Sequence, residues 1–308
     1  MNTQEIEYGG WKRNLRLSND EIELVVTLEV GPRIIHLAPL NGENLFYVFP
    51  GQLGKTGEAE WQNRGGHRLW IAPESNEDDP FTYFPDNAPV EYEVSGNSVR
   101  FWSPPELNNT RQKEIEISLD GVNVQVTHRV KNIGTESMML APWALSVMAP
   151  GGVAVVPQPP LGSHPENLAP NRTLIVWPFT DMTDPRLHFG SKFWTMAQDS
   201  TRGPVKLGLN HGAGIDGTGT SGWVAYVLNG VAFVKTIERD PNATYPDGNS
   251  NCELFTNKLM LEVESLGPLT TLAAGAQVEH RESWRIVPNI AAFSRNDDAS
   301  IAAALSNL

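Results

Sequence analysis

Between Asn63 and Glu74 the sequence collects side chains that could transfer protons and bind oxygen-rich ligands. Imidazoles and carboxylates exchange protons, and arginines bind oxygen atoms through paired hydrogen bonds. Gly65 and Gly66 predict a backbone that can approach a ligand closely. A single histidine beside glycines is more often an ordinary loop residue, but these charged and aromatic neighbours favour a ligand-binding role. The candidate residues of this stretch are Arg64, His67, Arg68, Trp70 and Glu74.

A second group of carboxylates lies near the other end of the chain, at Glu262 and Glu264. If this segment is a strand, both carboxylates project from the same face. Two buried carboxylates are costly unless their face lines a wet cavity, so a ligand-facing sheet surface is predicted, with a solvated edge as the alternative. Glu264 is predicted to be the proton acceptor because it lies next to the turn that begins at Ser265, and Glu262 is predicted to act mainly in binding.

His128 lies in the segment 122–130, where valines alternate with polar residues. It shares its face with the valines, which favours a hydrogen-bonded core histidine over a ligand-facing one, although both remain open. Arg33, Lys206 and Lys235 are further cations that could contact an anionic ligand.

Other chemistries have little support. The seven histidines show no metal-binding spacing, Cys252 is the single cysteine, and no Gly-x-Ser-x-Gly motif occurs. General acid–base catalysis without a metal or cofactor remains. Nine tryptophans, Trp143 among them, could stack on the apolar face of a sugar ring, although any one of them is more often a core residue. A small carbohydrate is therefore the predicted ligand.

The elements that would position these residues are strands. Glycine (27 residues) and proline (23) interrupt nearly every window that could form a helix. Short alternating runs are joined by turns such as Asp120-Gly121, a strong hairpin signal. The pattern predicts one all-β domain over residues 1–308, a large antiparallel β-sandwich with less than about 15% helix and a short helical tail near 297–308. Long loops over 148–185 are predicted to serve a site.

Composition limits the partners. The net charge of −13 argues against nucleic acid, whose phosphates need clustered cations. A single cysteine requires no oxidising compartment. No apolar run reaches the length of a membrane span and the first residues lack a signal-peptide pattern, so a soluble, cytoplasmic protein without a membrane partner is expected. The sequence does not indicate an oligomeric state.

Four segments resemble the galactose mutarotase (aldose 1-epimerase) superfamily, and more closely a bacterial branch with a GGHRLW-type motif. These segments are 30–37, 64–67, 261–268 and 274–284, and the GGHRLW motif of the branch is at 65–70. The resemblance implies a β-sandwich and an isomerase that acts at the anomeric carbon of an aldose. It also implies that the segment with Glu264 holds the family's glutamate base.

One departure concerns the general acid. The family usually carries a second histidine near the middle of the chain, where this sequence has Trp143. Because indole cannot protonate a ring oxygen, the acid must come from His67, His128 or a water molecule bound by arginine, or the reaction differs. Two alternatives to the isomerase therefore stay open: a non-catalytic carbohydrate-binding protein, and an epimerase or lyase of an acidic or phosphorylated sugar. In the second alternative the anion contacts would come from Arg33, Arg64, Arg68, Lys206 and Lys235.

Overall fold

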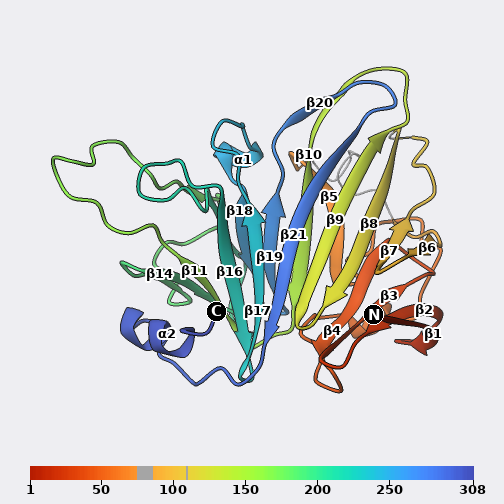
Figure 1. Ribbon diagram of the computed structural model, residues 1–308, viewed down its shortest axis with the longest axis horizontal. Helices are drawn as coiled ribbons and strands as arrows, with labels where there is room; N and C mark the ends of the chain where they lie inside the picture. Colours follow the sequence, from red (N-terminus) through yellow and green to blue (C-terminus); the bar gives the residue numbers. More distant parts are fainter. Residues whose placement is uncertain (75–85, 109) are drawn as a thin grey trace.

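The computed structural model describes residues 1–74, 86–108 and 110–308, and it consists of two large antiparallel sheets that pack face to face (Figure 1). The first sheet contains, in spatial order, β1 (Asn2–Tyr8), β2 (Trp11–Ser18), β3 (Ile22–Thr27), β4 (Arg33–Pro39), β5 (His67–Ala72), β10 (Met138–Met148), β19 (Leu261–Leu266), β18 (Cys252–Thr256), β15 (Val205–Leu209) and β12 (Leu174–Val176), and β20 (Thr270–Leu272) pairs with β10.

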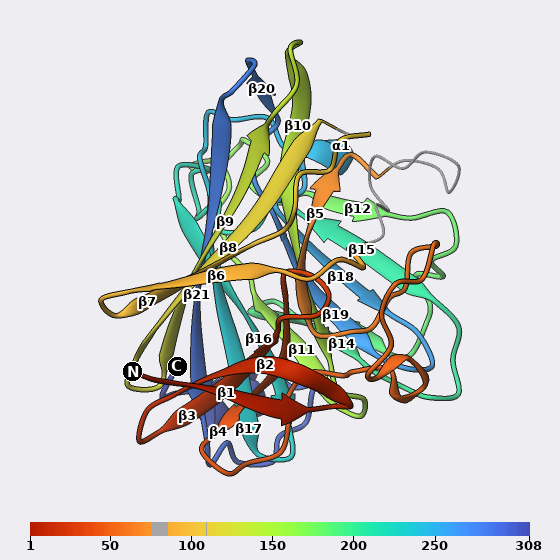
Figure 2. The same ribbon diagram turned by 90° about the vertical axis from the view of Figure 1, so that its right-hand side faces the viewer.

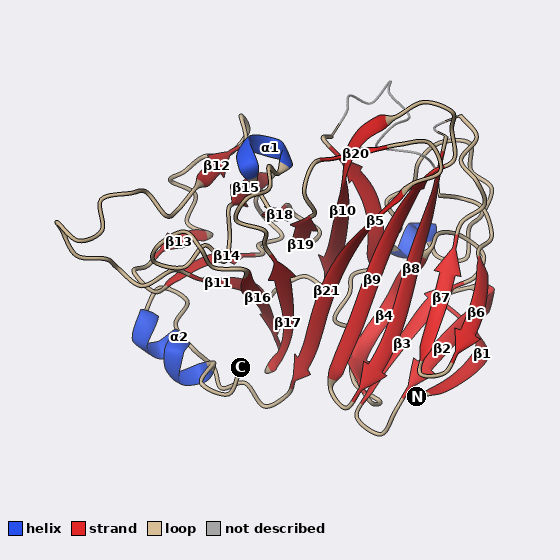
Figure 3. Ribbon diagram, turned by 45° about the horizontal axis from the view of Figure 1, so that its top comes forward, coloured by secondary structure: helices blue, strands red, loops and turns tan. Residues whose placement is uncertain are grey.

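The second sheet contains, again in spatial order, β13 (Leu187–Phe189), β14 (Phe193–Ala197), β11 (Val153–Pro157), β16 (Ser221–Leu228), β17 (Val231–Glu238), β21 (Gln277–Val287), β9 (Asn123–Asn132), β8 (Arg111–Asp120), β7 (Ser98–Trp102) and β6 (Glu91–Ser95). The helices of the described chain are short: η1 (Pro50–Gln52), α1 (Pro246–Asn249) and α2 (Asp298–Ala304), as Figure 3 shows. The predicted all-β sandwich is confirmed.

Local sequence accounts for the clearest elements. The β8–β9 hairpin turns at Asp120-Gly121, where Gly121 has a φ of 56° and Asp120 pairs with Asn123. Buried and less buried residues alternate along β8, so one face of the hairpin packs on the core. At the other end of the chain, Asp297 caps α2 by accepting hydrogen bonds from the amides of Ala299 and Ser300. In the described residues no helix is long and apolar enough to cross a membrane.

The side-chain alternation of the first sheet separates an apolar face from a polar one. On β19, Leu261 and Val263 pack in the core between the two sheets, whereas Glu262 and Glu264 project from the opposite face. Strands β10 and β18 flank β19, and β5 and β15 lie next to them, so that these strands extend this outward face (Figure 2). The candidate site lies on that face.

Gly65 and Gly66 approach the protein's own backbone rather than leaving room for a ligand. Both have positive φ values, 78° and 73°. A Cβ atom on Gly65 would lie 2.0 Å from the carbonyl oxygen of Tyr47, and one on Gly66 would lie 2.2 Å from that of Ile34. The expectation that this pair opens the backbone to a ligand is therefore wrong. The two glycines let the chain enter β5 tightly against its neighbours.

This close packing makes Gly66→Ala strongly destabilising. The substitution combines the left-handed backbone, about 1–2 kcal/mol for a residue with a Cβ, with a steric clash that only backbone movement relieves. Gly96 is a matched control, since it also has a positive φ, 59°, but a Cβ there meets nothing within 4 Å. Urea unfolding should show a clearly larger loss of stability for Gly66→Ala than for Gly96→Ala. Equal losses would mean that the clash is relieved at no energetic cost.

Candidate functional site

A groove of about 910 Å³ lies on the outward face of the first sheet, over β5, β10, β19, β18 and β15. Strand residues form its floor, and loop residues from both sides form its walls. Its lining residues are Ala59, Glu60, Trp61, Asn63, Arg68, Trp70, Glu74, Trp143, Leu145, Trp177, Phe179, Lys206, Phe255, Asn257, Met260 and Glu262. Six of the residues predicted from the sequence are among them, namely Arg68, Trp70, Glu74, Trp143, Lys206 and Glu262.

Aromatic rings cover much of this groove. Trp143 of β10 pairs in register with Trp70 of β5, and their ring centroids lie 5.5 Å apart in an edge-to-face arrangement. Trp61, from the loop before β5, lies 5.2 Å from Trp70. Trp177, from the loop after β12, supplies another indole on the far side. Such a surface suits a ligand with an apolar face and a polar rim.

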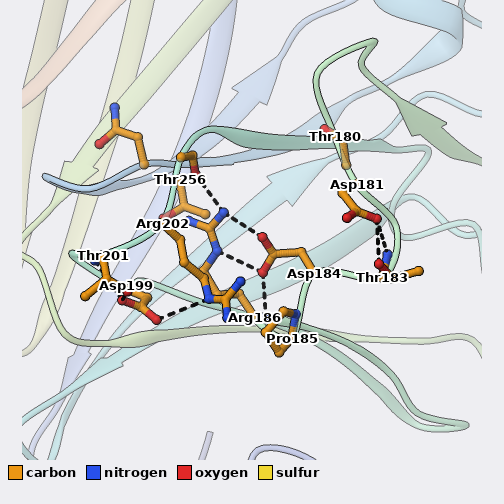
Figure 4. A network of polar contacts seen from close by, with 12 residues as sticks. Thr180, Asp181, Thr183, Asp184, Pro185, Arg186, Asp199, Thr201, Arg202 and Thr256 are labelled. Carbon is orange, nitrogen blue, oxygen red and sulfur yellow. Dashed lines mark hydrogen bonds and ion pairs between the residues drawn. The ribbon is translucent and has the colours of Figure 1, made fainter.

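The wall that carries Trp177 and Phe179 is tied to the sheet by hydrogen bonds. The Thr180 hydroxyl donates to the carbonyl of Lys206 at 2.8 Å and accepts from its amide at 2.9 Å. Further along the same loop, the Arg186 guanidinium binds the Asp184 carboxylate at 2.9 Å and the carbonyl of Gly203 at 2.7 Å (Figure 4). These contacts fix the loop against the strand β15 that bears Lys206.

Glu262 is the strand carboxylate that reaches the groove. Its Oε1 atom lies 3.2 Å from Nη2 of Arg68, whose guanidinium stacks 4.1 Å from the ring centroid of Trp70. Burial raises the pKa of Glu262, Arg68 lowers it, and the nearby Glu264 raises it, with a net upward shift. Glu262 is therefore a stronger base than an ordinary carboxylate, and it is only partly neutralised by its cation.

Glu264 shares the face of Glu262, as the sequence predicted, but it lies beneath the groove rather than in it. Its side chain is fully buried, and Oε2 accepts a hydrogen bond from Nε1 of Trp143 at 2.8 Å. Lys206 lies 3.2 Å from the same oxygen. Trp143 and Lys206 thus separate Glu264 from a ligand. The expectation that Glu264, in preference to Glu262, faces the ligand does not fit this geometry.

Lys206 is held at the floor of the groove by two carboxylates and two indoles. Its Nζ atom lies 2.7 Å from Glu253 and 3.2 Å from Glu264, and 4.6 Å and 4.8 Å from the ring centroids of Trp143 and Trp177. Burial alone would lower the pKa of Lys206, but the two carboxylates outweigh it and raise this pKa above its usual value. For Glu253 the directions are reversed: burial raises its pKa, and the charge of Lys206 lowers it, with a net upward shift.

Sequence reasoning missed Glu253. The residue lies on β18 directly opposite Glu264 of β19, and its side chain is completely buried. The available signal was the alternation in Cys252–Thr256, which places Glu253 and Phe255 on one face of a short strand. Only the pairing of β18 with β19 shows that this face continues the one that bears Glu262.

Arg33 and Arg64 hold the rim of the groove instead of lining it. Arg33 donates from Nη1 to the carbonyls of Asn63 and Gly65 at 2.8 Å and 2.6 Å. Burial and the charge of Arg68 lower the pKa of Arg33 to about 9. Arg64 binds Glu58 and donates to the carbonyl of Lys55 at 2.9 Å. Neither guanidinium lines the groove, so the expectation that they contact a ligand does not fit their positions.

His67 and His128 lie between the two sheets, on the opposite side of the first sheet from the groove. Side chains alternate along β5, so the ring of His67 points inward and the guanidinium of Arg68 points outward. Its side chain is completely buried, and Nε2 lies 2.7 Å from Nε2 of His128. The expectation that His67 borders the groove is therefore wrong. His128 takes the core position that its alternation with valines favoured.

The hydrogen bonds of this pair assign its protons. Nδ1 of His128 lies 3.1 Å from the carbonyl of His280, which can only accept, so Nδ1 carries the proton and Nε2 is an acceptor. His67 must then donate from Nε2, and its Nδ1 accepts from the hydroxyl of Ser146 at 2.9 Å. Burial lowers the pKa of both His67 and His128, which keeps both rings neutral.

Lys235 also lies between the sheets and not in the groove, and with His67, His128 and Glu282 it forms an inner cluster. Its Nζ atom lies 2.8 Å from Oε1 of Glu282, and it donates to the carbonyl of Val263 at 3.0 Å. Trp284 donates to the other oxygen of Glu282 at 2.8 Å, and Ser265 donates to Oε1 at 2.5 Å.

One atom each of His67, His128 and Glu282 lie within 4.8 Å of one another, a spacing that a metal ion could bridge. The donors around Glu282 already bind both of its oxygens, and one proton joins the two histidines. Hydrogen bonds thus account for this spacing. The inner cluster is a buried polar network that links β5, β9, β10, β17, β19 and β21.

The fold is shared with sugar-related proteins of known structure. A galactose mutarotase-like protein from Lactobacillus casei matches with a TM-score of 0.57 and 13% identity over 89% of this chain and 100% of its own. A galactose mutarotase related enzyme from Lactobacillus acidophilus matches with a TM-score of 0.52 and 10% identity, over 90% and 98%. A candidate aldose 1-epimerase from Klebsiella pneumoniae matches with a TM-score of 0.60 and 11% identity, over 99% and 85%.

No family model matches the sequence, and neither does any curated protein sequence. At these identities the structural matches define the fold alone. The chain thus has a galactose mutarotase-like fold, and its function must be argued from the groove.

Proposed function

We propose that the groove binds a carbohydrate and that the protein exchanges the anomers of an aldose. The observation that carries this proposal is the combination of four tryptophans with Glu262, Arg68 and Lys206 around one cavity. The indoles offer flat surfaces for the apolar face of a sugar ring, and the charged groups and Asn63 offer hydrogen bonds to its hydroxyls. The galactose mutarotase-like fold supports the same conclusion.

In the proposed reaction Glu262 accepts the proton of the anomeric hydroxyl. Its raised pKa makes it a better proton acceptor near neutral pH than an ordinary carboxylate, and Arg68 keeps it ionised. The bond between C1 and the ring oxygen then breaks, and the ring recloses on either face of the carbonyl.

A second candidate is carbohydrate binding without catalysis. The observation in its favour is that none of the described residues lining the groove is a histidine. His67 and His128, two of the candidates for the acid, are enclosed between the sheets. The two candidates share a ligand class and differ only in whether bound sugar reacts.

Anomer exchange of a panel of aldoses, followed by NMR exchange spectroscopy, tests the proposal. We expect wild-type protein to accelerate exchange of at least one aldose, and Glu262→Gln to slow it by at least about a hundredfold, the lower end for a general base. The matched control is Glu91→Gln, an exposed carboxylate of β6 in the other sheet, which should leave the rate unchanged.

The outcomes separate the two candidates. Binding of a sugar without any acceleration would replace the isomerase with the binding protein. Failure to bind or to convert any sugar of the panel would overturn both. A wild-type rate in Glu262→Gln would show that Glu262 is not the base.

A further inference from the structure

The surroundings of Lys206 are unusual for a lysine that would merely bind ligand. Lys206 lines the groove, yet its two carboxylate partners, Glu253 and Glu264, lie beneath it with no exposed surface. The indoles of Trp143 and Trp177 lie beside Nζ at 4.6 Å and 4.8 Å. Four groups from β10, β18, β19 and a loop therefore fix one ammonium at the floor of the cavity.

The N–H groups of Lys206 leave at least one donor for a ligand. An ammonium has three N–H groups and no acceptor. Glu264 accepts a hydrogen bond from Nζ at 3.2 Å, and Glu253 forms an ion pair with Nζ at 2.7 Å, both on the buried side. At least one N–H is therefore available to an acceptor in the groove, which Glu262 also lines.

This arrangement does not suit the anion contact expected of Lys206. A phosphate or carboxylate bound at Lys206 would have to share it with two buried carboxylates, and Arg68 is similarly engaged by Glu262. Juxtaposed like charges disfavour such a ligand strongly. An uncharged oxygen atom that becomes negative only during the reaction is a better partner.

We propose that Lys206 is the proton donor to the ring oxygen during anomer exchange, and that Glu253 is the positioning residue that aims it. This inference rests on the proposed isomerase function. It supplies the acid that the histidines do not, because they lie on the other side of the sheet.

The step balances within the site. Glu262 removes the proton of the anomeric hydroxyl, the C1–O5 bond breaks, and O5 takes a proton from the Lys206 ammonium. The open aldehyde then leaves Glu262 protonated and Lys206 as the neutral amine. When the O5 hydroxyl attacks either face of C1, its proton returns to Lys206 and the carbonyl oxygen takes the proton of Glu262. No further reactant is needed.

The carboxylates also set the strength of this acid. Burial opposes the charge of Lys206, but Glu264 and Glu253 raise its pKa overall, so the ammonium persists at neutral pH. Such an acid protonates only a strong base, and the ring oxygen becomes one as its bond to C1 breaks. Lys206 therefore stabilises the transition state more than the bound sugar.

Two variants of Lys206 distinguish proton donation from charge alone. Lys206→Arg keeps the positive charge and the hydrogen bonds, but a guanidinium does not release its proton. We expect Lys206→Arg to lower kcat for anomer exchange by at least about a hundredfold, with the Kd for the sugar changed by less than about threefold. Lys206→Ala should show the same loss, and added ethylamine should restore part of its rate.

The control variants localise the effect. Glu253→Gln removes one partner of Lys206 beneath the groove and should lower kcat by about tenfold with little change in Kd. Lys12→Met, an exposed lysine of β2, should match wild type. Circular dichroism must first show that each variant is folded, since Lys206→Ala leaves two buried carboxylates without a cation. Lys206→Arg retains the charge and is the decisive variant.

The results separate this inference from the proposed function. A wild-type rate in Lys206→Arg, together with a slow Glu262→Gln, would overturn the role of Lys206 and leave the isomerase in place. A rise in Kd that explains the whole loss of rate would reassign Lys206 to binding. If wild-type protein exchanges no anomers, the function and this inference fail together.

Discussion

Replacing Lys235 by methionine is expected to destabilise the protein by about 3–5 kcal/mol, the usual effect of removing one partner of a buried ion pair. Lys235 and Glu282 are both without exposed surface, and their charged atoms lie 2.8 Å apart between the sheets. Methionine fills a similar volume but leaves the Glu282 carboxylate charged and buried without its cation. Urea unfolding monitored by circular dichroism measures the loss.

Two further variants test this explanation. The double variant Lys235→Met/Glu282→Gln removes both charges, so it should be clearly more stable than the single variant Lys235→Met. Arg100→Met breaks the exposed pair of Arg100 and Glu93, whose side chains are 45% and 59% exposed, and should change stability little. If Lys235→Met resembles Arg100→Met, the inner pair contributes no more than a surface contact.

The fold was predictable because its local signals agree with one another. Asp120-Gly121 specifies a hairpin turn, and the alternation on both sides of it specifies which face of β8 and β9 is buried. Glu262 and Glu264 could be placed on one face because the period of a strand is two. None of these statements needs knowledge of distant residues.

The site was less predictable because it depends on which side of a strand faces the other sheet. His67 and Arg68 are neighbours on β5, so their side chains point to opposite faces and only one of them can reach the groove. Treating the stretch around Gly65 as a loop concealed this constraint. Had the strand been predicted from residue 67 onward, Arg68 and Trp70 would have been separated from His67.

Contacts between distant segments account for the rest. Glu264 lies beneath Lys206 and Trp143 only because β15, β10 and β19 bring three separate segments together. Glu253 gains its place opposite Glu264 in the same way. Burial then decides the chemistry, since it leaves Glu262 in contact with the groove and removes Glu264 from it. No spacing within one segment contains that information.

The same burial predicts a marked loss of stability in mild acid. His36, His67, His128, His211 and His280 are all buried, and His36 shares the lowered pKa of the other four. Burial lowers the pKa of each, to about 3 for His280 and about 4 for His211, against an ordinary value of 6.5. Below pH 6.5 the unfolded chain therefore binds protons that the native histidines do not, and unfolding becomes more favourable as the pH falls.

Carboxylates with raised pKa values oppose this effect in part. Burial raises the pKa of Glu253 and Glu262, as well as of Asp86 and Asp247, so as the pH falls from neutrality these carboxylates take up protons earlier in the native state than in the unfolded chain. Five histidines oppose four carboxylates, so a net uptake of protons on unfolding is expected. Each proton taken up in net corresponds to about 1.4 kcal/mol per pH unit, so stability should fall as the pH drops below 6.5.

Urea unfolding at half-unit steps between pH 5 and pH 7.5 checks the sign and the slope. We expect the free energy of unfolding to rise with pH up to about 6.5 and then to level off. His280→Gln should reduce the slope by about one proton, because an amide in place of this imidazole takes up none on unfolding. His164→Gln, at an exposed loop position, should leave the slope unchanged. A flat profile from pH 5 to pH 7 would mean that the inner histidines accept protons within the folded protein, which their enclosure between two sheets disfavours.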